Sequence, residues 1–125
     1  MSFVIVTNNP LVRQRYEGLY RLDFIDGTYM NVLERVRDRV HLGHKLLTHP
    51  LSGSVKPGET PYKSVMISSK PGIIDMESLG TVEMSIVTCR KFPIKCENLP
   101  QRVLEDFQLV DFTLIDSAIP SATVR

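Results

Sequence analysis

The feature that most constrains this chain is an uninterrupted apolar, largely β-branched run near its start, from Phe3 to Thr7. A run without polar alternation is typical of a strand that is covered on both faces, as in the centre of a parallel sheet. Asn8-Asn9-Pro10 follows directly, and these residue types suit the cap and first turn of a helix. The pattern therefore predicts a buried central strand that leads at once into a helix, which Gly18 ends.

The same alternation of strands and helices continues along the chain. Residues 20–25 alternate apolar and polar side chains, which predicts a strand nearer the sheet edge. Apolar positions recur at helical spacing from Tyr29 to His41, and Gly43 is suited to end that helix. Two further short apolar runs, residues 45–48 and 64–69, predict a third and a fourth strand.

Two helices are expected in the second half of the chain. Asp75 is suited to cap the first, whose apolar stripe runs toward Arg90, and Phe92-Pro93 breaks it. The second begins near Pro100, although residues 107–115 are apolar enough to form a strand instead. Residues 120–125 are expected to be a frayed tail.

This order of elements predicts an α/β fold: a three-layer, Rossmann-like domain with a short, mostly parallel sheet of about four strands and helices on both faces. Right-handed crossovers would place the first strand beside the third, residues 45–48. Ligands of such sheets bind outside the carboxyl ends of the strands. The loops that follow these two strands are therefore expected to face one crevice.

Length and composition fit one globular domain over residues 1–125. Hydrophobic residues make up 42% of the chain and charged residues 23%, which is ordinary for a folded domain. The net charge of +1 offers no long-range field for binding nucleic acid or an anionic membrane. The N-terminal residues lack the features of a signal peptide, so a soluble, cytoplasmic protein is expected.

The chain has two cysteines and three histidines, and neither set matches a known metal or redox spacing. Cys89 and Cys96 form neither a CxxC pair nor a zinc knuckle, and two free thiols are the expectation. His41, His44 and His49 have no matching Cys or Asp cluster. No structural metal and no cofactor are therefore expected.

The segment from residue 49 to residue 63 is rich in Pro, Gly and hydroxyl side chains, which indicates a long loop. Loops of this length inside a compact domain are usually functional or mobile. Its backbone amides, its lysines and the helix start after Asn9 could form a pocket for a carboxylate or phosphate. A solvated turn is the plainer alternative. The predicted site consists of Asn8, Asn9, His49, Ser52, Gly53, Ser54, Lys56, Tyr62 and Lys63.

His49 is the candidate catalytic residue, because it follows a predicted strand and precedes Ser52 by three positions. A histidine beside a hydroxyl can act as a general base. No Gly-x-Ser-x-Gly sequence accompanies it, and an anchoring role for His49 in the loop is the favoured alternative. The acidic side chains of the last helix, Asp111 among them, are expected at the surface.

Four stretches of the chain resemble the GrdX family. They are TNNP at residues 7–10, KLLTHPLSGSVKP at 45–57, ETPYKS at 59–64 and LEDFQLVD at 104–111. GrdX proteins are encoded beside the glycine reductase system of anaerobic bacteria that ferment amino acids. The resemblance implies an accessory protein of that system, with reductase components as candidate partners, and it supplies no catalytic residues.

Two hypotheses of different classes follow. In the first, which is favoured, the chain is an accessory module that binds a small anionic ligand or a partner protein. In the second, it is a small enzyme of the same pathway that uses His49 with a hydroxyl or lysine of the loop. The motif loop has no cysteine, so a role as a thiol or selenol carrier is not expected.

Overall fold

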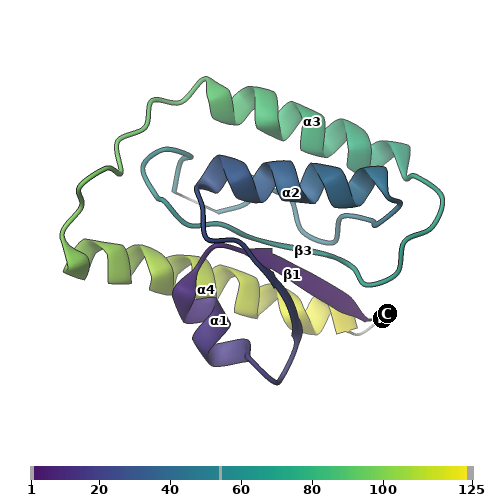
Figure 1. The fold of residues 1–125 in the computed structure, drawn as a ribbon, viewed down its shortest axis with the longest axis horizontal. Helices are drawn as coiled ribbons and strands as arrows, with labels where there is room; N and C mark the ends of the chain where they lie inside the picture. The colour runs from purple at the N-terminus through teal and green to yellow at the C-terminus, as the bar shows by residue number, and fades with distance from the viewer. Residues whose placement is uncertain (1, 54, 124–125) are drawn as a thin grey trace.

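The computed structural model describes residues 2–53 and 55–123, and it shows an α/β arrangement with helices on both sides of a small sheet (Figure 1). β1 and α1 come first, and α3 and α4 follow the last strand. The elements are β1 (Phe3–Thr7), α1 (Pro10–Tyr16), β2 (Arg21–Phe24), α2 (Tyr29–His41), β3 (Ser64–Ser68), α3 (Met76–Arg90) and α4 (Gln101–Thr123).

The core lies on both faces of β1, the central strand of the sheet order β2-β1-β3. Val4 and Val6 pack against α2 and α3 on one face, while Phe3 and Ile5 pack against α1 and α4 on the other. Successive side chains of a strand point to opposite faces, so a strand covered on both sides must be apolar throughout. The predicted central position of this strand is confirmed.

The sheet differs from the predicted one in size and direction. β1 and β2 are parallel, but β3 runs antiparallel to β1, so the sheet is mixed and has three strands among the described residues. A parallel neighbour needs a crossover connection, usually a helix. The connection from β2 to β3 does contain the helix α2. Residues 45–48 then run along β3 in the opposite direction, and the segment that follows them turns the chain back before β3 begins. The prediction of a mostly parallel, four-stranded sheet was wrong.

Residues 45–48 do not form the predicted third strand and do not lie beside β1. They make a single bridge, from Leu46 to Ile67 of β3. The amides of Leu47 and Thr48 share the carbonyl oxygen of Met66, at 2.9 and 3.3 Å. The Met66 amide is taken by the Thr48 hydroxyl, at 2.9 Å. A regular ladder cannot form where one carbonyl serves two amides and a side chain replaces the backbone acceptor.

The helices of the second half are close to prediction. Asp75 caps α3 by accepting a hydrogen bond from the amide of Ser78. α4 is helical throughout residues 107–115, so the alternative strand is not formed. α4 continues through Pro120 to Thr123, so residues 120–123 are helical where a frayed tail was expected. Residues 124–125 lie outside the described part of the chain.

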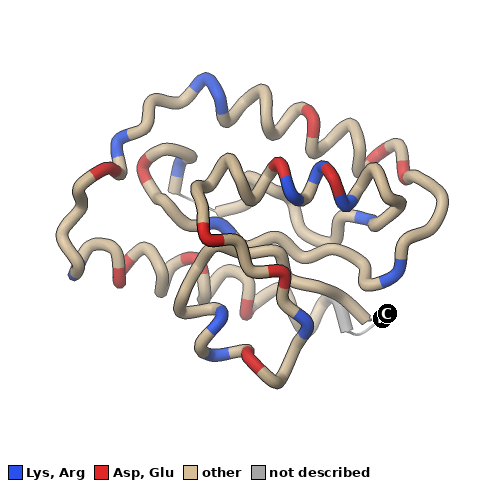
Figure 2. Tube along the Cα trace, in the orientation of Figure 1, with Lys and Arg blue, Asp and Glu red and all other residues tan. Residues whose placement is uncertain are grey.

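The charged residues are spread over the fold. Figure 2 shows Lys and Arg positions interspersed with Asp and Glu positions along the trace, as the net charge of +1 suggests. None of the helices in the described ranges is long and apolar enough to cross a membrane.

Truncating the central strand should be the costliest change on the α1–α4 face. Ile5 is fully buried, so Ile5→Ala should lower the free energy of unfolding by about 2–5 kcal/mol, measured by urea denaturation. Leu19→Ala removes a side chain that is 70% exposed and should cost less than about 0.5 kcal/mol. Equal losses for the two variants would contradict the central position of β1.

Candidate functional site

A buried carboxylate holds together the elements that meet at the carboxyl end of β1. Asp111 of α4 is 7% exposed. Its Oδ1 accepts from the backbone amide of Ser64 at 3.0 Å, and its Oδ2 accepts from the Ser64 hydroxyl at 2.7 Å and from Asn9 Nδ2 at 2.9 Å. The Ser64 hydroxyl also lies 2.7 Å from Thr7 Oγ1. One carboxylate thereby connects α4 with the end of β1 and the start of β3.

The side chain of Asn9 forms all of its hydrogen bonds with other residues of the protein. Its Oδ1 accepts from the amide of Leu11 at 2.9 Å and so caps α1, while its Nδ2 donates to Asp111 and to the carbonyl of Gln108. Asn9 is fully buried. The helix start that the sequence suggested as part of an anion pocket is therefore closed by the side chain of Asn9 itself and covered by α4.

Asn8 fastens the long loop to the sheet. Its Nδ2 donates to the carbonyls of Gly27 and Pro61, at 3.0 and 2.8 Å, and its Oδ1 accepts from the amide of Lys63 at 2.9 Å. Both amide hydrogens of Asn8 are used in this way. Asn8 therefore positions the end of the loop and offers no free donor to a ligand.

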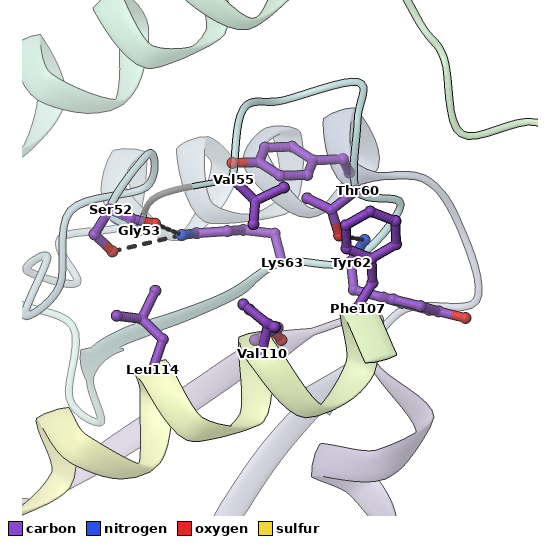
Figure 3. Close-up of a pocket in the computed structure, with 11 residues that line it drawn as sticks. Ser52, Gly53, Val55, Thr60, Tyr62, Lys63, Phe107, Val110 and Leu114 are labelled. Carbon is purple, nitrogen blue, oxygen red and sulfur yellow. Dashed lines mark hydrogen bonds between the residues drawn. The ribbon is translucent and has the colours of Figure 1, made fainter. Parts of the chain in front are cut away.

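Lys63 is the one lysine of the predicted site that points inward. It is only 3% exposed, and its Nζ donates to the Ser52 carbonyl at 2.6 Å and lies 3.4 Å from the Ser52 hydroxyl (Figure 3). Burial lowers the pKa of Lys63, and the negative charge of Asp111 opposes that shift. Within residues 2–53 and 55–123, no carboxylate oxygen lies within ion-pair distance of its ammonium.

A small cavity of about 30 Å³ lies at this ammonium. Ser52, Gly53, Thr60, Tyr62 and Lys63 line it from the loop side. Val110 and Leu114 of α4 face them from below in Figure 3, with Phe107 further along the same helix. A volume of this size holds about one water molecule, so a larger ligand reaches Lys63 only if the loop moves.

Six of the nine predicted site residues lie at the cavity or next to it. Ser52, Gly53, Tyr62 and Lys63 meet at the cavity, and Asn8 and Asn9 lie next to it in the hydrogen-bond network. Lys56 is exposed and does not line the cavity. Ser54 lies outside the described residues.

His49 stands apart from the cavity. Its side chain is exposed, and its Nδ1 accepts from the amide of Leu51 at 3.0 Å. It lines a shallow hollow against α3, beside Met76 and Gly80. Nδ1 therefore supports the turn at the start of the loop, and the imidazole does not face Lys63.

Asp111, Tyr29 and Thr60 belong to the site and were missed by the sequence analysis. Asp111 was expected at the surface, yet it is buried. A signal was present, because Asp111 is four residues before Ile115 and eight before Ile119, both buried, and this spacing places all three on one helical face. An acidic residue on an apolar stripe indicates a buried hydrogen-bond acceptor.

Comparison with known proteins identifies one family. A family model described as GrdX-like protein matches residues 4–120, nearly the whole chain. Neither a curated protein nor a solved structure matches the chain.

Removing the buried carboxylate should destabilise the whole fold. Asp111→Ala leaves the Ser64 and Asn9 donors without their acceptor, so the free energy of unfolding should fall by about 1–3 kcal/mol. Asp106→Ala is the matched control, because Asp106 is exposed on the same helix, and it should change stability by less than about 0.5 kcal/mol. Chemical denaturation measures both. If the two variants are equally stable, the network does not hold the fold.

Proposed function

Because the chain belongs to the GrdX-like family, we propose that it is an accessory protein of the glycine reductase system that binds a small carboxylate or phosphate beside Lys63. The anion is either a free molecule or a group carried by a reductase component. The buried ammonium of Lys63 is the observation that carries the proposal.

The positive charge of Lys63 has no anionic partner among the described residues. A buried ammonium costs several kcal/mol unless an anion or good hydrogen bonds compensate it. Lys63 has the neutral oxygens of Ser52, whereas the oxygens of Asp111 already accept from Ser64 and Asn9. A bound carboxylate or phosphate would supply the missing negative charge, with charge-assisted hydrogen bonds that are about twice as strong as neutral ones.

Binding at Lys63 is coupled to the loop. The cavity is too small for glycine or phosphate, and Ser52 holds the ammonium in place. An anion that takes the place of the Ser52 carbonyl would release that end of the loop. The other end is held by Asn8 at Pro61 and by the Tyr62 hydroxyl, which accepts from Gln108 at 2.9 Å. The loop would therefore open at Ser52 and stay attached at Pro61.

The chemistry of the chain favours binding over catalysis. His49, the candidate base, faces α3 and not the cavity. Burial raises the pKa of both Cys89 and Cys96, which reduces the thiolate fraction that redox chemistry needs. An enzyme that uses His49 with a loop hydroxyl or lysine remains the alternative, and it would convert a small substrate and lose activity on His49→Ala.

The anion site can be tested with two lysines of the same loop. Glycine, phosphate and acetyl phosphate are titrated by calorimetry into the wild type, Lys63→Met and Lys56→Met. Binding to the wild type and to Lys56→Met is expected, with a loss of at least about tenfold in affinity for Lys63→Met. Equal affinities for the two variants would place the site elsewhere. A pull-down from glycine-grown cells, with the same pair of variants, tests an anion carried by a reductase component.

Lys63 should also make stability depend on pH. Its pKa is lowered in the folded state, so the unfolded chain binds the proton more tightly and the free energy of unfolding rises as pH increases from the folded pKa toward the unfolded one. We expect this rise at pH values below the ordinary pKa of lysine, about 10.4, in the unliganded wild type, and its loss in Lys63→Met. Denaturation at several pH values measures it. The same slope in both proteins would mean that Lys63 is not desolvated.

A further inference from the structure

A second and much larger cavity lies at the carboxyl ends of the parallel strands β1 and β2. Its volume is about 570 Å³, within the range of about 300–1,000 Å³ that is usual for small-molecule sites. Asn8 and Gly27, which follow the two strands, form its base. The start of α2, the end of α3 and residues 92–97 surround it. Of the described residues that the sequence predicted for the site, Asn8 and Tyr62 line it.

Three aromatic side chains line this cavity: Tyr29, Tyr62 and Phe92. None of them takes part in a ring–ring or cation–π contact with the described residues. Those contacts involve a different set, namely Phe3, Tyr16, Tyr20, Phe24 and Phe112. Tyr29 is buried and belongs to the apolar core, whereas Tyr62 and Phe92 are partly exposed.

The charged residues at the cavity leave an excess of negative charge. Glu34 and Glu97 line it together with Arg90, and no lysine does. In the part of the chain that the structure describes, Arg90 forms no ion pair with either carboxylate. The start of α2 and the end of α3 both border the cavity, and their dipoles have opposite signs there. The two carboxylates therefore make the net charge of the cavity lining negative.

From the aromatic lining and the acidic excess, we infer that this cavity binds a small organic cation of the alkylated ammonium class. Aromatic rings attract such cations through their negative faces, and the attraction grows when the cation is withdrawn from water. Alkyl groups on the nitrogen match the apolar part of the lining, which includes Met30 and Ile94. This site is independent of the anion proposed at Lys63, although Tyr29, Thr60 and Tyr62 line both cavities.

The chain provides its own reporter for the cavity. It has two cysteines, and both Cys89 and Cys96 line this space. Each is partly buried. We therefore expect a molecule in the cavity to shield both thiols, so that the rate of alkylation measures occupancy.

The test compares two probes that differ in charge and are nearly equal in shape: choline and its neutral carbon analogue, 3,3-dimethylbutan-1-ol. Alkylation of the full chain by N-ethylmaleimide is followed by mass spectrometry, and affinities are measured by calorimetry. Choline should slow the alkylation of both thiols at least about fivefold at saturation, and the alcohol less than about twofold. Equal protection by the two probes, or protection by neither, overturns the inference.

Two matched variants locate the binding. Phe92→Leu removes a partly buried ring outside the helices and strands and should weaken choline binding about 2- to 30-fold. Phe24→Leu makes the same change at a ring that already carries the Arg13 guanidinium, 4.7 Å from its centroid, and should leave choline binding unchanged. Glu34→Gln should weaken choline binding and leave the alcohol unaffected. Lys63→Met should bind choline as the wild type does, which separates this site from the proposed anion site. Equal effects of the two Phe variants overturn the inference.

Discussion

The fold depends on one buried carboxylate more than on any other polar group. Asp111 accepts hydrogen bonds from Ser64 and Asn9, so it fixes the end of β1, the start of β3 and the cap of α1 relative to α4. A buried carboxylate is costly unless donors surround it, and here each donor is itself held by a backbone element. The apolar faces of β1 supply most of the burial, while this network determines where the elements stop.

The same network explains how the end of the long loop is held and why Lys63 is buried. β3 begins at Ser64, directly after Lys63, and Asn8 holds the backbone amide of Lys63. The side chain of Lys63 then lies under the loop, where its ammonium donates a hydrogen bond to the Ser52 carbonyl. The loop therefore covers a buried cation, while Leu51 at its start packs against the apolar core. Two cavities share Tyr29, Thr60 and Tyr62 in their linings: the small one contains Lys63, and the larger one contains Glu34 and Glu97.

Much of the fold could be predicted from the local spacing of apolar residues, because that spacing shows which face of a helix or strand is buried. The run at Phe3–Thr7 predicted a central strand, and helical spacing predicted α2 and α3 nearly to their ends. The direction of β3 and the absence of a strand at residues 45–48 could not be predicted. They depend on tertiary hydrogen bonds, among them those that the Met66 carbonyl accepts and the Met66 amide donates. Sequence patterns predicted that Ser52, Gly53, Tyr62 and Lys63 share one site. They could not predict that Lys63 is buried while Lys56 is exposed. Both are lysines of one polar loop, and only tertiary contacts distinguish them.

The position of α4 at the end of the element order also affects when the chain can fold during its synthesis. Asn9 and Asp111 are 102 positions apart, and the Tyr16 hydroxyl donates to Asp116, which is 100 positions away. β1 and α1 are made before α4, so Val12 and Tyr16 can cover part of one face of β1, and the rest of that face stays uncovered until α4 has been made. Contacts of such sequence separation form late and slowly. Part of an apolar strand therefore stays exposed between the synthesis of α1 and that of α4, and a chaperone would protect the chain most during this interval.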